Sequence, residues 1–261
     1  MRVTAVQLDT AWHDKAANCA RAGELVRRAQ PPSGSLIVLP EMFATGFSMD
    51  VGATVEDSEG PGHTLLSQIA SQYRCVVVGG VVTQAEGGHG ANEAVVFGPG
   101  GGELTRYRKL HPFSYAGETE YFVAGEKMVT FRCGEFLAAP FICYDLRFPE
   151  AFRKAVVTGA DLLVVIANWP AARERHWLTL LEARAIENQA YVVGVNRVGS
   201  DPENIYTGRS IVVSPTGEVV ADAGREEGVL QAELEIAAVR EFREKFPALR
   251  DINPSLMPPQ R

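Results

Sequence analysis

The stretch DLLVVIAN, Asp161–Asn168, decides the fold class of this chain. Between its polar ends every residue is apolar, so a β-strand formed here buries both of its faces. The stretch LIVL at Leu36–Leu39 has the same character. Because a strand with one face in water alternates apolar and polar residues, these two runs predict strands in the interior of a layered fold.

Short runs rich in β-branched residues recur on both sides of these two, with helical patterns between them. Apolar residues spaced three and four apart predict helices, the first of which is capped by Asp14 and carries Cys19, Ala22 and Val26 on one face. This mixture predicts one α/β domain over residues 1–261, with helices covering two sheets. The expected strands are 2–7, 36–39, 75–82, 93–97, 104–108, 127–132, 136–143, 162–166, 191–195, 210–213, 218–221 and 229–234. The other expected helices are 66–73, 149–159, 174–188 and 236–245, and glycine-rich hairpin turns are expected at 87–90, 99–102 and 214–218.

The composition of the 261 residues argues against several classes of protein. With 46% hydrophobic and 22% charged residues, the chain is close to the globular average, which excludes intrinsic disorder and collagen-like repeats. Its 25 basic and 32 acidic residues argue against nucleic acid as the main partner. The first residues, MRVTAVQLDT, lack the apolar run of a secretory signal, and no run of about 18 apolar residues predicts a membrane span. We therefore expect a cytoplasmic protein without a membrane partner.

The four cysteines, Cys19, Cys75, Cys133 and Cys143, are not spaced as metal ligands or as a redox pair. In a reducing cytoplasm they are expected to be free thiols, and most free thiols are small buried apolar groups. The histidines do not recur at metal-ligand spacing either. The sequence thus predicts no metal, no disulfide and no organic cofactor. One question that follows is whether one of the four thiols differs from the rest.

Three residues of complementary chemistry each follow a strongly apolar strand. They are Glu41 in LIVLPEMF, Lys109 in LTRYRKLHPF and Cys143 in LAAPFICYDLRFPE. Ligands in layered α/β folds bind at the carboxyl ends of strands, so these three positions form a candidate site. Taken singly, each has a structural interpretation: a solvated loop carboxylate, a surface lysine and a buried thiol.

The segments around these residues resemble the nitrilase (carbon–nitrogen hydrolase) superfamily. LPEMF, YRKLHPF and ICYDLRFPE are similar, in order and rough spacing, to the Glu, Lys and Cys segments of that superfamily, and the resemblance extends over nearly the whole chain. Further segments agree at 167–177, 184–199 and 214–221. Within the superfamily, CYDLRFP, LPEMFATGF and ANWPAAR look most like the ω-amidases, which hydrolyse the terminal amide of 2-oxoacid amides.

The resemblance implies a covalent mechanism that uses a small amide and water. Glu41 is expected to take the proton of Cys143, whose thiolate attacks the amide carbonyl. Lys109 and the backbone N–H of Tyr144 are expected to hold the oxyanion. Ammonia then leaves, and water activated by Glu41 hydrolyses the thioester to release the 2-oxo acid.

A second glutamate often found in the family is matched by Glu118 in SYAGETE, where it would hold Lys109 charged and oriented. Glu120 competes for this assignment, and the preceding Ala-Gly favours Glu118. A Cys–His pair is the other usual way to activate a thiol. The family pattern gives no histidine that role, so we interpret His111 as lining the substrate pocket and His176 as structural.

A 2-oxoacid substrate requires a group that recognises its carboxylate. We expect Arg173 to bind it, with Tyr115 or Tyr144 hydrogen-bonding nearby and Trp169 forming an apolar wall. The alternative is that Arg173 is one of several surface charges. A further arginine, Arg147, could join a buried ionic network that fixes the turn after Cys143, with partners Asp145 and Glu150, or could bind substrate.

The resemblance also implies a four-layer α-β-β-α sandwich of two mixed β-sheets and subunits that pair as homodimers. The C-terminal segment 240–261 mixes aromatic and charged residues and could pack on a partner subunit or fray. Two alternative activities stay open: an aliphatic amidase and an N-carbamoyl amino acid hydrolase. A true nitrilase is less favoured, since Tyr144 follows the cysteine where nitrilases commonly carry Trp-Glu. A non-catalytic relative would be expected to have lost Glu41, Lys109 or Cys143.

Overall fold

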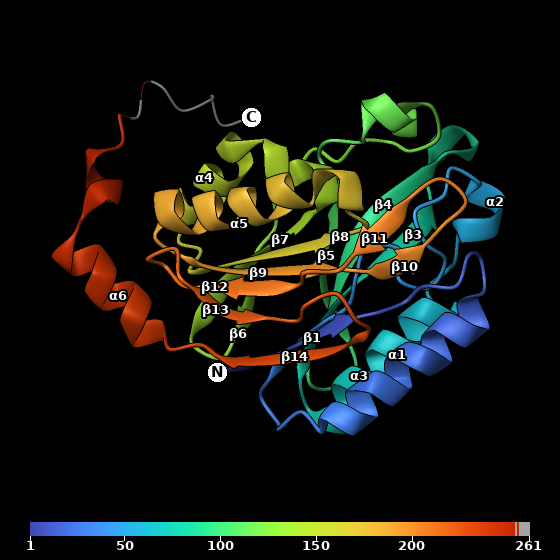
Figure 1. Cartoon of the computed structure of the whole chain (residues 1–261), viewed down its shortest axis with the longest axis horizontal. Helices are drawn as coiled ribbons and strands as arrows, with labels where there is room; N and C mark the ends of the chain where they lie inside the picture. The colour runs from blue at the N-terminus through green and yellow to red at the C-terminus, as the bar shows by residue number, and fades with distance from the viewer. Residues whose placement is uncertain (254, 256–261) are drawn as a thin grey trace.

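Two six-stranded β-sheets lie face to face in the computed structural model, which describes residues 1–253 and 255 (Figure 1). The apolar side chains between the sheets form one continuous core. The first sheet has the order β14 (Gly228–Glu233), β1 (Arg2–Gln7), β2 (Leu36–Val38), β3 (Val76–Gln84), β4 (Gly90–Phe97) and β5 (Glu103–Arg108). The second has the order β13 (Val219–Asp222), β12 (Ile211–Val213), β9 (Tyr191–Asn196), β8 (Leu162–Ala167), β7 (Phe136–Ile142) and β6 (Phe131–Cys133).

Both sheets are mixed, and they share one pattern of strand directions. In the first, β1, β2 and β3 are parallel to one another and the outer strands pair antiparallel. In the second, β7, β8 and β9 form the parallel centre. The strands that the apolar runs predicted, β2 and β8, lie in these parallel centres and are completely buried. Polar residues that follow them therefore emerge at strand ends.

Helices cover the outer face of each sheet, as Figure 1 shows. On the first sheet, α1 (Lys15–Ala29) and α3 (Pro61–Tyr73) pack on each other and close a second apolar core. The Asp14 side chain accepts a hydrogen bond from the Ala17 N–H and caps α1, as the sequence predicted. On the second sheet lie α4 (Pro149–Val157) and α5 (Glu174–Asn188). The predicted four-layer α-β-β-α sandwich of mixed sheets is confirmed.

Four short elements differ from the sequence prediction. The strand expected at 127–132 is only the three-residue β6, and residues 127–130 are irregular. A short helix, α2 (Val51–Thr54), and a hairpin of β10 (Val198–Ser200) with β11 (Ile205–Thr207) were not expected. Elements of three or four residues carry too few positions to show a periodicity. The glycine-rich turns, by contrast, do connect antiparallel strands: β3 to β4, β4 to β5 and β12 to β13.

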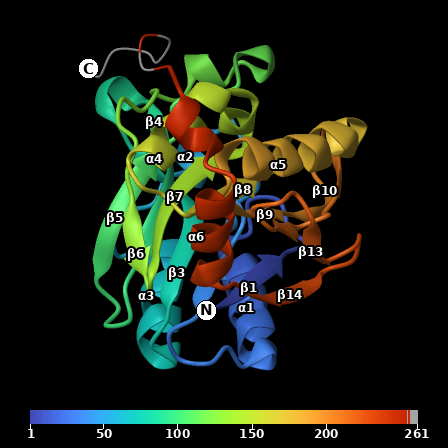
Figure 2. The same ribbon diagram turned by 90° about the vertical axis from the view of Figure 1, so that its left-hand side faces the viewer.

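The last helix, α6 (Ile236–Lys245), lies at one end of the sandwich, outside both helical layers (Figure 2). Arg243 anchors it by donating to Asp161 Oδ1 at 3.0 Å and to the Ala160 carbonyl at 2.8 Å. Of the segment 240–261, residues 254 and 256–261 lie outside the described residues. Its packing on a partner, the pairing of subunits and the single-domain organisation stay predictions.

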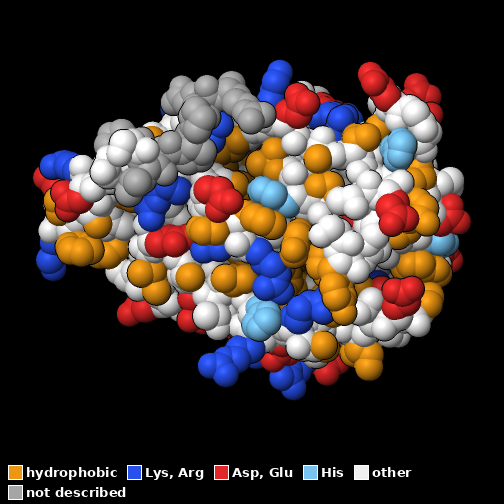
Figure 3. Space-filling view, turned by 90° about the horizontal axis from the view of Figure 1, so that it is seen from above, with side chains coloured by type: hydrophobic (Ala, Val, Ile, Leu, Met, Phe, Trp, Pro, Cys, Tyr) orange, Lys and Arg blue, Asp and Glu red, His pale blue; other side chains and the backbone are white. Residues whose placement is uncertain are grey.

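The surface mixes apolar and charged side chains. On the face seen in Figure 3, basic, acidic and apolar groups are interspersed, in keeping with the balance of 25 basic and 32 acidic residues. Within residues 1–253 and 255, none of the helices combines the length and the apolar character that a membrane span requires.

Candidate active site

Glu41 follows β2 in a loop that the neighbouring strand approaches closely. The Gly80 N–H donates to the Pro40 carbonyl at 3.0 Å, and the Phe43 N–H donates to the Gly80 carbonyl at 3.2 Å. A Cβ atom at Gly80 would lie 2.4 Å from the Glu41 Cα, so glycine is required there. Met42 has a φ of 42°, in the left-handed region, and turns the chain directly after Glu41. The backbone thus holds Glu41 tightly on both sides.

Lys109 leaves the end of β5 and lies between two carboxylates. Its Nζ is 3.1 Å from Glu41 Oε1 and 2.8 Å from Glu118 Oε2. The lysine is 1% exposed and both glutamates are fully buried. Burial acts to lower the pKa of Lys109, but the charges of Glu118 and then Glu41 outweigh it and raise that pKa above its usual value. The ammonium is therefore charged at neutral pH. Glu120, the competing residue, is exposed.

Neutral N–H groups complete the binding of the two carboxylates. The Asn92 Nδ2 donates to Glu41 Oε1 at 2.7 Å and to Glu118 Oε1 at 3.0 Å. The Asn168 N–H donates to Glu41 Oε2 at 2.8 Å, and the Phe113 N–H donates to Glu118 Oε2 at 2.5 Å. All four carboxylate oxygens are thus fixed by donors on separate elements.

Cys143 directly follows β7 and begins the 3₁₀ turn η4 (Cys143–Arg147). Its φ of 45° is unusual for a residue with a side chain, which marks a sharp turn out of the strand. Its Sγ is 3.9 Å from the carbonyl oxygen of Asn168, the residue that also holds Glu41. Burial and the charge of Glu41 raise the pKa of the Cys143 thiol well above its usual value, while Lys109 opposes them. The thiol is therefore protonated in the free protein, so attack requires a base.

The turn after Cys143 is fixed by Asp145, and the partners differ from those that the sequence suggested. Asp145 Oδ2 accepts from the Tyr107 hydroxyl at 2.7 Å and the Ile142 N–H at 3.0 Å. Its Oδ1 accepts from the His111 backbone N–H at 3.0 Å and from His111 Nδ1 at 2.8 Å. One buried carboxylate thus ties the Cys143 turn to the segment after Lys109.

Two interpretations from the sequence are wrong here. The ionic network of Asp145 with Arg147 and Glu150 does not form, because Arg147 faces the pocket and Glu150 is exposed. His111 does not line the pocket, because its ring bonds Asp145 and stacks on Phe148 at a centroid distance of 3.8 Å. The side chain that the sequence placed against substrate instead supports the turn that carries the nucleophile.

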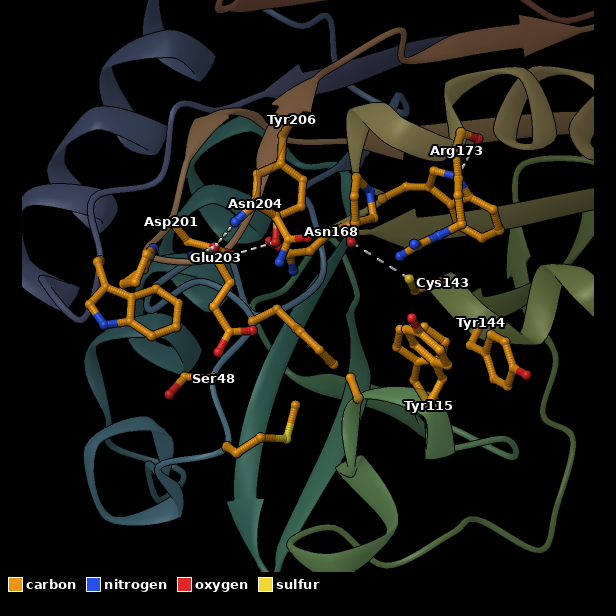
Figure 4. Close-up of a pocket in the computed structure, with 18 of the residues that line it drawn as sticks. Ser48, Tyr115, Cys143, Tyr144, Asn168, Arg173, Asp201, Glu203, Asn204 and Tyr206 are labelled. Carbon is orange, nitrogen blue, oxygen red and sulfur yellow. Dashed lines mark hydrogen bonds between the residues drawn. The ribbon is translucent and has the colours of Figure 1, made fainter.

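A pocket of about 500 Å³ opens beside Cys143 (Figure 4). Of the expected substrate-binding residues, Tyr144, Trp169, Arg173 and Tyr115 line it. Tyr115 is 86% exposed and lies at the rim, whereas Trp169 is almost fully buried. The Trp169 Nε1–H donates to the Arg173 carbonyl at 2.8 Å, which fixes both the wall and the start of α5.

Two guanidinium groups, those of Arg147 and Arg173, reach the same pocket. The Arg147 group lies 4.8 Å from the Trp169 ring centroid and the Arg173 group lies 5.6 Å from that of Phe113. Neither forms a salt bridge with a carboxylate of the described residues. Burial, and then the charge of Arg173, lowers the pKa of Arg147. Two cations that repel each other without a carboxylate partner favour the binding of an anion.

Sequence reasoning missed part of this site. Asn92 is a polar residue within the buried strand β4, and that exception to an apolar run was the available signal. Asn168 binds Glu41 through its backbone N–H and its side chain, a role that the sequence did not suggest. The β10–β11 hairpin adds a further wall, and no sequence signal identified it; it contributes Asp201, Glu203, Asn204 and Tyr206. Among the described residues, no cluster of three His, Cys, Asp or Glu side chains is arranged to hold a metal ion.

The fold and the site together define a class of enzyme. The site places a thiol beside a buried carboxylate and a buried ammonium at the carboxyl ends of strands. This arrangement is typical of a hydrolase with a cysteine nucleophile. Comparison with known proteins names the class more closely. The carbon-nitrogen hydrolase family model matches residues 2–244, and the chain belongs to this family. It is therefore an amidohydrolase that acts on linear amides.

Among its relatives are two amidases that match almost end to end. Omega-amidase YafV of Escherichia coli is 39% identical over 254 residues, covering 96% of each chain. The 2-oxoglutaramate amidase of Bacillus subtilis is 32% identical over 255 residues, covering 97% of this chain and 98% of the relative. The predicted resemblance to ω-amidases is confirmed.

Solved structures of related proteins have the same fold as this chain. A CN-hydrolase superfamily protein from Xanthomonas campestris, crystallised with an arsenic adduct in its active site, has a TM-score of 0.91 at 33% identity and covers 97% of both chains. An amidase from Nesterenkonia sp. AN1 has a TM-score of 0.81 at 25% identity, covering 95% of this chain and 98% of the other. That structure is a glutamate-to-glutamine variant in which acrylamide has added to the active-site cysteine.

Proposed function

We propose that this amidohydrolase cleaves the terminal amide of small 2-oxo dicarboxylic acid monoamides, releasing ammonia and the 2-oxo dicarboxylate through a thioester on Cys143. The observation that carries the substrate class is the pair of guanidinium groups, Arg147 and Arg173, which reach the pocket beside the thiol and have no carboxylate partner among the described residues. An ω-amide of a dicarboxylic acid has a free carboxylate at its other end, which such a pair binds. The names of the relatives, omega-amidase and 2-oxoglutaramate amidase, support the same substrate class.

Acylation begins with the protonated thiol. Glu41 takes the proton of Cys143 as the sulfur attacks the amide carbonyl, because the raised pKa of the thiol leaves little thiolate without a base. The carbonyl π electrons move to oxygen. Lys109 stabilises this oxyanion together with the N–H of Tyr144, which belongs to the first turn of η4 and therefore has no partner within it. The C–N bond then breaks, and Glu41 returns the proton to the departing nitrogen as ammonia forms.

Deacylation uses the same groups. Glu41, ionised again, removes a proton from a water molecule that attacks the thioester carbonyl, and Lys109 and Tyr144 hold the second oxyanion. The C–S bond breaks, the carboxylate product leaves and the thiol recovers its proton. Glu118 does not exchange protons in this scheme. Its two contacts with Lys109 keep the ammonium charged and directed at the oxyanion.

The alternative activities make different demands on the two arginines. An aliphatic amidase has no substrate anion for Arg147 and Arg173 to bind. The substrate of an N-carbamoyl amino acid hydrolase does carry a carboxylate, so the two arginines in the pocket also favour this activity as a second candidate. Ammonia release from succinamate, 2-oxosuccinamate and an N-carbamoyl amino acid separates the proposed ω-amidase activity from this second candidate. We expect 2-oxosuccinamate to be the best substrate of the three.

Replacing Arg173 with alanine is expected to raise the KM for 2-oxosuccinamate by about 30-fold, since a charge-assisted hydrogen bond is worth about 2 kcal/mol. The KM for butyramide, which has no carboxylate, is expected to stay unchanged. Steady-state ammonia release with both substrates measures this, and Arg175→Ala on the exposed side of α5 is the matched control. Equal KM values for 2-oxosuccinamate in wild type and Arg173→Ala would remove Arg173 from substrate binding.

A further inference from the structure

Asn92 occupies a special position in the charge cluster. Besides Lys109, it is the side chain in the described part of the chain that donates to both Glu41 and Glu118. We propose that Asn92 is a positioning residue that holds the Glu41 carboxylate ionised and oriented beside Cys143. This inference rests on the proposed role of Glu41 as the base, and it adds a residue that the mechanism above does not use.

The charges of the cluster do not balance. Glu41 and Glu118 carry two negative charges, Lys109 carries one positive charge, and all three are at most 1% exposed. The thiol of Cys143 is neutral because its pKa is raised. One negative charge is therefore left without a counter-ion in the cluster and is buried away from bulk solvent. Such a charge is tolerated only where N–H groups solvate it, and the Asn92 amide is shared by both carboxylates.

The sheet holds the Asn92 donor rigidly. Asn92 lies inside β4, opposite Val82 of β3, and not in a loop. Its backbone carbonyl oxygen accepts a hydrogen bond from the backbone N–H of Lys109 at 2.9 Å. The backbone of one residue thus places the lysine while its side chain places the two glutamates. An amide fixed in this way cannot follow Glu41 to a new position when the carboxylate accepts a proton.

Loss of the Asn92 donor changes the basicity of Glu41. A hydrogen bond donated to a carboxylate favours the ionised form, so removing the Asn92 donor makes Glu41 hold a proton to higher pH. The other titratable groups of the cluster are Lys109, Glu118 and Cys143. The Asn92 substitution also removes a donor from Glu118, but that carboxylate keeps hydrogen bonds from Lys109 and from the Phe113 N–H. The acid limb of the pH profile of kcat/KM is therefore expected to move upward.

The test compares pH profiles of Asn92→Ala and wild type with 2-oxosuccinamate. We expect the acid limb to move up by about one pH unit, with a loss in kcat and little change in KM. Asn92→Asp keeps the shape but replaces the donor by a third carboxylate, so its shift is expected to be larger. The matched control is Asn188→Ala, which removes a fully buried asparagine of α5 that donates to the Arg184 carbonyl. This control is expected to lower stability and leave the limb unmoved.

A second readout needs no amide substrate. On the acid side of neutral pH, alkylation of Cys143 by iodoacetamide depends on transfer of the thiol proton to Glu41, so its rate falls there as Glu41 becomes protonated. The same upward shift is expected there in Asn92→Ala. The inference is overturned if the acid limb stays at its wild-type pH in both Asn92 variants, or if the loss of activity appears in KM alone. If wild type hydrolyses none of the amides while the alkylation limb still shifts, the proposed function fails and the role of Asn92 stands.

Discussion

Replacing Cys143 with alanine is expected to lower kcat/KM for 2-oxosuccinamate by about 10⁴-fold or more, because the variant has no atom that can form the acyl intermediate. The loss is expected in kcat, since Arg147, Arg173 and the pocket walls are unchanged. Ammonia release under saturating substrate measures it. The alanine side chain fits the same turn, although Cys143 adopts a φ of 45°, so the variant is expected to fold.

A matched thiol provides the control for this experiment. Cys19 lies on α1, and burial raises its pKa to about 12. Cys19→Ala is expected to keep nearly the full activity of wild type. Activity retained in Cys143→Ala, or lost equally in Cys19→Ala, would show that the chemistry does not depend on the thiol at the end of β7.

The Glu41→Gln variant is expected to separate hydrolysis from thiol reactivity. Without the base, ammonia release is expected to fall by about 10³-fold. The charge of Glu41 raises the pKa of Cys143, so removing that charge lowers it, and Lys109 then stabilises the thiolate. Alkylation of Cys143 by iodoacetamide at mildly alkaline pH is therefore expected to continue. Peptide mass spectrometry measures the alkylation, and ammonia release measures the hydrolysis.

Two outcomes would contradict the role given to Glu41. Hydrolysis at the wild-type rate would show that another group takes the proton. Loss of alkylation together with hydrolysis would show that Glu41 is needed to shape the site and not as a base. Glu120→Gln is the matched control, because Glu120 lies in the same segment as Glu118 but is exposed. It is expected to change neither rate.

The layers of the fold could be predicted because their signal is local. Apolar runs such as those within Leu36–Leu39 and Asp161–Asn168 predict buried strands from only a few consecutive residues. The chemistry of Glu41 and Cys143 was also visible locally, since each follows such a strand. Lys109 differs, because it follows β5, a polar edge strand that is largely exposed or half-buried. What the sequence could not show is how these residues are supported.

The supporting contacts join residues that are far apart in the chain. Asn92 is 51 residues from Glu41, and the N–H of Asn168 is 127 residues from the carboxylate that it binds. His111 illustrates the same limit, since its position near Lys109 suggested the pocket, whereas Asp145, 34 residues away, holds its ring. Side-chain direction in such cases is set by the packing of one sheet on the other, which no local pattern records.

The proposed mechanism requires a covalent acyl intermediate on Cys143. Mixing enzyme with 2-oxosuccinamate, quenching with acid and measuring the intact mass tests it most directly, because a thioester survives acid. We expect a mass increase equal to that of the acyl group in wild type, located on the peptide that contains Cys143, and no increase in Cys143→Ala. Turnover without an adduct on that peptide, or the same adduct in Cys143→Ala, would contradict it.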